Sequence, residues 1–218
     1  MESILRESVF PEWLPILLMV CLVLVAAAKL ADAKRFNEFI LLPFTDKYFM
    51  VSGKHRKFFT VFNMLLFSSQ VISFSLFIFY AVKLLRGDEN YHDFFLFLRI
   101  LSFLTLFIGV KYYLEKITAH LFSIDKLIDE YLYFKLSHKN WLGLLLLPAN
   151  FLVFYTFRGN ISIFVIVIIL SLTINLFLLF YTFRKNQKTI VNDIFYFILY
   201  LCTLEISSYY LLYKLIVL

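Results

Sequence analysis

Long apolar runs separated by short polar connections dominate this chain. An α-helix needs about 20 predominantly apolar residues to cross the roughly 30 Å hydrocarbon core of a bilayer. Six runs approach or exceed this length, and a soluble protein of this size could not bury them all. The pattern predicts an all-α, polytopic transmembrane helical bundle in a single domain, residues 1–218, with spans at about 13–30, 58–85, 94–113, 141–157, 161–183 and 194–217.

The fourth span is the shortest, and it contains Gly143 and Pro148, so we expect a kink there. The distribution of Lys and Arg along the chain supports counting this stretch as a span. Leaving out Lys29 and Arg99, which lie within spans, fourteen Lys and Arg residues flank the first, third and fifth connections, against five on the other side. Because cytoplasmic connections carry the excess of Lys and Arg, both termini are predicted outside the cytoplasm. Omitting the fourth span would break this alternation.

Two of the predicted cytoplasmic stretches are neither spans nor ordinary loops. In residues 117–134, apolar residues recur at helical spacing with charged residues between them, which is typical of an amphipathic helix. We expect this segment to lie on the inner membrane surface or to prolong the third span into the cytoplasm. Its apolar face contacts the membrane or the bundle, or alternatively docks another protein. The stretch 36–51, interrupted by Pro43, is apolar enough to lie in the interface too.

Composition agrees with the membrane class and disfavours several others. The hydrophobic fraction is 62% and the mean hydropathy is +0.84, whereas soluble proteins have roughly 45–50% apolar residues. The net charge of +6 comes from basic residues in the connections, which indicates membrane orientation rather than nucleic-acid binding. Cys21 and Cys202 lie in apolar runs, and neither cysteines nor histidines show a ligand spacing, so we expect no metal and no cofactor.

Two ionisable residues are predicted inside spans, where a charge costs about 2.5–3.5 kcal/mol at a helix centre. Arg99 lies between one and two turns into the third span, and Glu205 lies near the middle of the sixth. Their depths allow an intramembrane charge pair. In a functional reading Glu205 titrates as part of a proton or ion relay. In a structural reading it is neutralised by Arg99 or bonded to a neighbouring hydroxyl.

Amides form a milder polar helix face. Asn63 and Gln70 are seven residues apart and therefore share one face of the second span, while Asn150 and Asn175 lie in the fourth and fifth. Such residues usually form hydrogen bonds between helices, worth about 0.6 kcal/mol each. The alternative is that they line a cavity.

A cluster of polar residues gathers at the inner end of the third span, at Lys111, Tyr112, Glu115, Lys116 and His120. This arrangement is typical of a headgroup-facing site for an anionic lipid or a phosphate. Ordinary anchoring of the helix end by Lys and Tyr explains the same residues.

Residues between 111 and 148 resemble a known family. Lys111, Phe122, Asn140-Trp141-Leu142-Gly143 and Leu147-Pro148 are similar to a family of small polytopic membrane proteins of the Bacteroidota that is classed as a domain of unknown function. The abundance of Phe, Tyr and Lys suits that phylum. The resemblance covers nearly the whole chain and implies a bacterial inner-membrane location, with envelope machinery such as a secretion or motility apparatus as its setting. It implies no activity and no catalytic residue.

The short connections and the lack of a catalytic motif lead to one functional hypothesis and two alternatives. We expect a non-enzymatic subunit or assembly factor of an inner-membrane complex, whose partners are the lipid bilayer and other membrane proteins and not nucleic acid. The first alternative is a transporter or proton-coupled component that uses Arg99 and Glu205. The second is a lipid-modifying membrane enzyme built around residues 111–120.

Overall fold

The computed structural model describes residues 11, 13–42, 60–86, 93–121, 125–156 and 161–190. For residues 85–86, 126–127, 130 and 177–190 it describes the backbone alone. Every regular element in these ranges is helical, which confirms the all-α prediction for this part of the chain. The elements are α1 (Trp13–Ala31), α2 (Ala33–Ile40), α4 (Val61–Arg86), α5 (Phe94–Leu121), α6 (Asp125–Phe151), a π-helix (Leu152–Thr156) and α7 (Ile161–Ile190).

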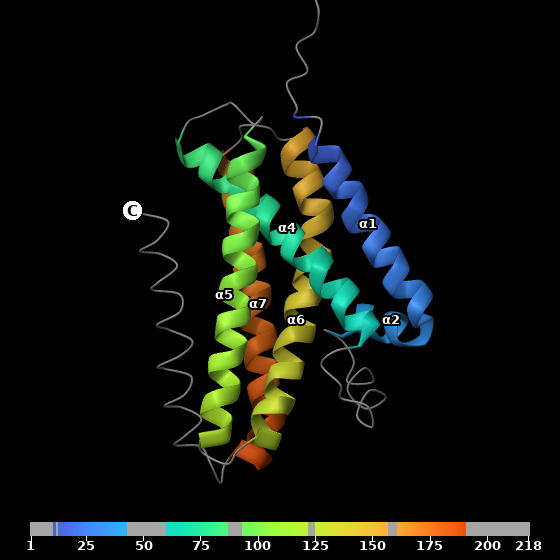
Figure 1. Ribbon diagram of the computed structural model, residues 1–218, viewed down its shortest axis with the longest axis vertical. Helices are drawn as coiled ribbons and strands as arrows, with labels where there is room; N and C mark the ends of the chain where they lie inside the picture. Colours follow the sequence, from blue (N-terminus) through green and yellow to red (C-terminus); the bar gives the residue numbers. More distant parts are fainter. Residues whose placement is uncertain are drawn as a thin grey trace, which may run out of the picture.

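The long helices form a bundle in which α4 is central. This helix crosses the bundle obliquely and packs against α1, α5 and α6, while α6 also packs against α7 (Figure 1). Successive long helices alternate in direction, so the start of α1, the end of α4 and the start of α5 lie at the same end of the bundle (Figure 1). A short corner joins α1 to α2 at the opposite end of α1.

Side-chain caps mark where two of these helices begin. Asp32 precedes α2, and its Oδ1 accepts a hydrogen bond of 3.0 Å from the backbone N–H of Arg35. Thr60 precedes α4, and its Oγ1 accepts one of 3.3 Å from the backbone N–H of Asn63. Each cap satisfies a donor of the first turn that has no partner within the helix. The cap at Asp32 lets the chain turn sharply between α1 and α2.

Aromatic rings fill the core at the end of the bundle where α1 begins. The Trp13 ring lies 5.4 Å from that of Phe79 and 5.3 Å from that of Phe97, between ring centroids. In the next layer, Tyr80 lies 5.1 Å from both Phe154 and Phe164. These contacts join α1, α4, α5 and α7 with the π-helix, so bulky rings hold the helices together.

Three of the described helices are long and apolar enough to cross a membrane, at Trp13–Ala31, Val61–Leu84 and Phe94–Leu121. The protein is therefore a membrane protein by the length and composition of these helices. The apolar stretch of α7, Ile161–Leu176, is shorter. The predicted sixth span, 194–217, lies outside the described residues.

The region around residues 117–134 differs from the expected arrangement. This stretch is divided between the end of α5, which continues to Leu121, and the start of α6, which begins at Asp125. It is not a separate surface helix, because α6 runs on without interruption into the predicted fourth span. Its apolar face is divided as well: Ile128 and Tyr131 are buried in the bundle, whereas Ile117 and Leu121 are exposed.

Pro148 lies inside α6, where we expected a kink. A proline removes one backbone hydrogen bond from a helix and crowds the preceding turn. The departure from α-helical geometry that the structure describes follows shortly afterwards, as the π-helix Leu152–Thr156. Short π-helical turns of this kind are rare and often accompany functional sites.

Candidate functional site

Arg35 of α2 joins three helices at one end of α1. Its guanidinium donates hydrogen bonds to Thr60 Oγ1 at 3.4 Å, to Asn63 Oδ1 at 3.1 Å and to the Tyr133 hydroxyl at 2.8 Å. The guanidinium carbon also lies 4.8 Å from the centroid of the Phe62 ring, a cation–π contact. Our sequence interpretation missed Arg35, because an arginine in a polar connection has no local mark of a bridging role.

A buried ion pair joins α5 and α6 near the same level. Lys135 Nζ lies 2.6 Å from Glu115 Oε1, with the Glu115 side chain 2% exposed and that of Lys135 14% exposed. Lys135 Nζ also lies 5.4 Å from the centroid of the Tyr131 ring. Glu115 therefore points into the bundle, in contrast to the headgroup-facing position that its place in the sequence predicts.

The other members of the predicted headgroup-facing cluster lie in two environments. Lys116 forms an exposed ion pair with Asp129 at 2.7 Å, and His120 Nδ1 lies 3.7 Å from Asp125 Oδ1 on the exposed tip of the bundle. Lys111 and Tyr112 are half-buried. Only Lys116 and His120 are thus placed at the surface, and their role in headgroup binding stays a prediction.

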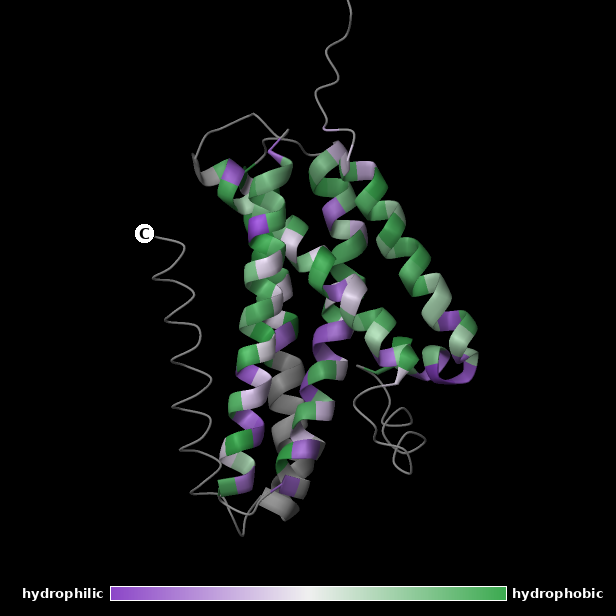
Figure 2. Cartoon of the chain, in the orientation of Figure 1, coloured by the Kyte–Doolittle hydropathy of each residue, from purple (hydrophilic) through white to green (hydrophobic). Residues whose placement is uncertain are grey.

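The Arg35 contacts and the Glu115–Lys135 pair lie at one level, because Tyr133 and Lys135 are two residues apart on α6. Hydrophilic residues gather in α2 and in the half of α5 and α6 beyond this level, whereas the opposite half of the bundle is largely hydrophobic (Figure 2). This change from hydrophobic to hydrophilic residues along the bundle is typical of a membrane boundary. We call this level the polar belt, defined by Arg35, Tyr133, Glu115 and Lys135.

The four amides of the predicted polar helix face serve different purposes. Asn63 binds Arg35, and Asn150 Nδ2 donates to the backbone oxygen of Ser73 at 2.9 Å and to its hydroxyl at 3.2 Å. Both form hydrogen bonds between helices. Gln70 and Asn175 instead line a cavity.

This cavity, the inner cavity, lies between α4, α5, α6 and α7 and has a volume of about 270 Å³. Gln70 is 3% exposed, and its Oε1 accepts no hydrogen bond from any residue that the structure describes. The polar lining comprises Gln70, Lys111, Glu115, Lys135, Lys139 and Asn175. The rest of the lining is apolar or aromatic and includes Phe74, Ile78, Leu104, Phe107, Ile108, Tyr112, Leu132, Leu136 and Leu142.

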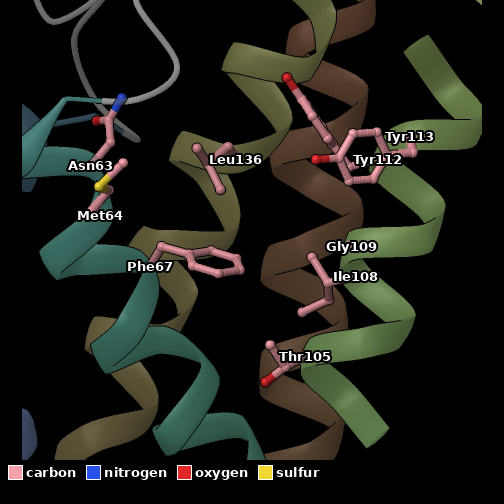
Figure 3. Close-up of a pocket in the computed structure, with 9 residues that line it drawn as sticks. All are labelled: Asn63, Met64, Phe67, Thr105, Ile108, Gly109, Tyr112, Tyr113 and Leu136. Atoms are coloured by element: carbon pink, nitrogen blue, oxygen red, sulfur yellow. The ribbon is translucent and has the colours of Figure 1, made fainter. Parts of the chain in front are cut away.

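A second cavity of about 270 Å³, the outer cavity, adjoins the first, because Ile108, Tyr112 and Leu136 line both. Figure 3 shows its walls, with Asn63, Met64 and Phe67 of α4 facing Thr105, Gly109 and Tyr113 of α5. Met64 is 48% exposed and Tyr113 is 67% exposed, so the outer cavity is open to the surroundings between α4 and α5.

The predicted intramembrane charge pair is placed only in part. Arg99 lies on α5 and is exposed in the described part of the structure. Glu205 lies outside the described residues. The pair therefore stays a prediction. Among the residues that the structure describes, no group of three His, Cys, Asp or Glu side chains could hold a metal ion.

Comparison with known proteins identifies a family. No curated protein and no solved structure matches the chain. One family model does match, described as a domain of unknown function (DUF4271), and it covers residues 14–216. The resemblance to an uncharacterised family was based on residues that include Lys111, Trp141 and Pro148. This match confirms that resemblance. The chain therefore belongs to the DUF4271 family, which it matches over nearly its whole length.

Proposed function

We propose that this protein is a non-enzymatic subunit or assembly factor of an envelope complex, such as a secretion or motility apparatus, in a bacterial inner membrane. In this proposal the chain crosses the membrane six times, with both termini outside the cytoplasm. The polar belt then marks the cytoplasmic boundary of the bilayer, and the tips of α5 and α6 project into the cytoplasm. The observation that carries the proposal is an exposed apolar stripe on α5.

The stripe consists of Val110, Leu114, Ile117 and Leu121, which are 58%, 44%, 57% and 74% exposed. Their spacings of four, three and four residues match the seam by which one helix packs against another. Lipid covers such residues at the depth of the bilayer, but Ile117 and Leu121 follow Glu115 of the polar belt. Exposed apolar residues beyond the bilayer mark contact surfaces for other proteins.

The length of α5 supports the same arrangement. Its 28 residues extend roughly 42 Å at 1.5 Å per residue, whereas the hydrocarbon core of a bilayer is about 30 Å thick. With Phe94 near one boundary, the helix passes the other boundary by roughly two turns. The partner that fits this projecting stripe is a helix of another membrane protein.

A photoreactive residue at Ile117 tests the partner. Incorporated into the full chain in native membranes, it is expected to cross-link to a second protein, because Ile117 lies on the stripe beyond the polar belt. The adduct is identified by mass spectrometry. Val23, 66% exposed near the middle of α1, is the matched control, and we expect no protein adduct from it. An adduct confined to residues 191–218 of the same chain, or to a second copy, contradicts the proposed complex.

Labelling of a single cysteine tests the orientation. In a chain with Cys21 and Cys202 changed to alanine, Ile117→Cys is expected to react with a membrane-impermeant maleimide only after the membrane is permeabilised. The physical reason is the positive-inside bias, which places this end of α5 in the cytoplasm. The control is a cysteine in the connection at residues 87–92, which is expected to react in intact spheroplasts. Reaction of Ile117→Cys in intact spheroplasts overturns the orientation.

A further inference from the structure

We propose that the inner cavity binds an uncharged amphiphile with an aromatic, hydroxyl-bearing head and an apolar tail, such as an isoprenoid quinol. Gln70 accepts a hydrogen bond from a hydroxyl of the head, and the tail passes through the outer cavity to the bilayer. This inference goes beyond the proposed complex and does not depend on it, since it concerns the inside of the bundle and not the exposed stripe of α5.

Gln70 is the polar group of the inner cavity that requires a hydrogen-bond donor. The residue is 3% exposed, it lines the cavity, and its Oε1 accepts no hydrogen bond in the part of the chain that the structure describes. Buried carbonyl oxygens nearly always accept a hydrogen bond, because one without a partner loses its hydration and gains nothing in return. A carbonyl oxygen accepts from a hydroxyl or an N–H group. A molecule that fits the cavity therefore carries such a donor.

The charged residues of the inner cavity require no counter-charge from a ligand. Glu115 and Lys135 pair with each other at 2.6 Å. Lys111 and Lys139 also have interactions of their own within the protein. The lining therefore gives no reason for a charged head, and an uncharged head avoids the cost of bringing a further charge into the bundle.

The depth of Gln70 in the bundle also favours an uncharged head. Asn63 of the same helix binds Arg35 of the polar belt, and Gln70 follows seven residues later, roughly 10 Å along the axis of α4 at 1.5 Å per residue. Over this distance α4 leads from the polar belt toward the largely hydrophobic half of the bundle (Figure 2). A charged group at such a depth in a membrane is costly, whereas a hydroxyl that donates a hydrogen bond is tolerated.

Aromatic side chains in the lining favour a planar head. Phe74 follows Gln70 by one turn on α4, and Phe107 and Tyr112 line the same cavity from α5. Aromatic rings attract one another in offset or edge-to-face contacts. The cavity has a volume of about 270 Å³, and an apolar protein cavity of about 150 Å³ is large enough to hold a benzene ring. A ring that bears hydroxyl groups therefore fits beside Gln70.

The outer cavity provides a path for the tail. Ile108 and Leu136 line both cavities, so the two spaces adjoin. Phe67 of α4 faces Gly109 of α5 across the outer cavity (Figure 3). The cavity opens to the surroundings beside Met64, which is 48% exposed. An apolar tail can therefore pass from a ring in the inner cavity to the bilayer.

Binding of a quinol to the purified full chain in mild detergent, measured by native mass spectrometry under reducing conditions, tests the hydrogen bond to Gln70. The probes are a quinol with a short isoprenoid tail and its dimethyl ether, which cannot donate a hydrogen bond. We expect the quinol to bind about tenfold more tightly than the ether. Gln70→Met keeps an unbranched side chain at the close contact with Gly143 but removes the acceptor, so it is expected to bind both probes with equal affinity.

Ser69→Ala is the matched control for Gln70→Met. It removes the neighbouring buried polar group, but the Ser69 hydroxyl donates to the backbone oxygen of Cys21 on α1 at 3.5 Å. We expect this variant to keep the preference for the quinol over the ether. Equal affinity of the unchanged chain for the two probes overturns the proposal and indicates that water alone serves Gln70. A preference that persists in Gln70→Met overturns it as well.

A variant in the outer cavity keeps the proposal testable if Gln70→Met does not fold. A Cβ atom at Gly109 meets nothing within 4 Å, so the side chain of Gly109→Leu has room to enter the outer cavity. This variant is expected to weaken binding of a long-tailed quinol by about tenfold and to leave the affinity for a tailless quinol unchanged. An equal loss for both quinols, or no loss for either, contradicts the path of the tail and overturns the proposal.

Discussion

Changing Gly143 to alanine is expected to push α4 away from α6 and to lower the free energy of unfolding by about 1–3 kcal/mol, the usual cost of overpacking. A Cβ atom at Gly143 lies only 2.8 Å from Cα, Cβ and Cγ of Gln70. The nearest atoms include backbone, so a change of side-chain rotamer cannot relieve the clash. The two helices must separate, and the displacement of Gln70 alters the inner cavity. Thermal unfolding of the purified protein in detergent measures the effect.

Gly109→Ala is the matched control for this change. Gly109 also lies inside a long helix, but a Cβ atom there meets nothing within 4 Å. Alanine is favoured over glycine within a helix by up to about 1 kcal/mol, so this variant is expected to be as stable as the unchanged chain or slightly more stable. Equal destabilisation by the two substitutions is incompatible with a close crossing of α4 and α6 at Gly143.

Glu115→Gln is expected to lower the free energy of unfolding by about 3–5 kcal/mol, the cost of breaking a buried ion pair. The change removes the carboxylate 2.6 Å from Lys135 Nζ and leaves the lysine charge in a site where its side chain is 14% exposed. The loss is measured by denaturant-induced or thermal unfolding in detergent. Combining Glu115→Leu with Lys135→Met is expected to restore most of the stability, because it removes both charges together.

The exposed ion pair between Lys116 and Asp129 provides the control for the loss of stability expected in Glu115→Gln. Asp129→Asn removes one carboxylate from a 2.7 Å pair whose side chains are 41% and 53% exposed. Exposed pairs contribute about 0–1 kcal/mol, so the loss is expected to be several times smaller than that of Glu115→Gln. A loss from Glu115→Gln no larger than that from Asp129→Asn means that water screens the Glu115–Lys135 pair.

Hydropathy predicts several boundaries of the long helices closely and others poorly. The predicted starts at residues 13, 94 and 161 coincide with those of α1, α5 and α7. Other boundaries are poorly predicted, because hydropathy falls where charged residues begin while the helix itself continues. The fourth span was expected to start at residue 141, yet α6 begins at Asp125. The third span was expected to end at residue 113, yet α5 runs to Leu121. The backbone stays helical there as Glu115 and Ala119 pack into the bundle.

Some residues of the candidate site could be recognised from the sequence, and others could not. Asn63, Gln70 and Glu115 stand out in the sequence because polar residues are costly near apolar runs. Their partners do not stand out. Arg35 and Tyr133 are 98 residues apart, and Glu115 and Lys135 lie on two different helices, 20 residues apart. Which of these residues meet depends on which helices are neighbours and on how they are rotated.

The sequence by itself determined the membrane class, the all-helical fold and the polar residues that need partners, because each follows from the transfer of local side chains between water and lipid. The tertiary structure decided the rest. α4 crosses α6 closely at Gly143, and residues of both α4 and α5 line the two cavities. A crossing angle arises from the contact of two helices far apart in sequence, so no local pattern contains it.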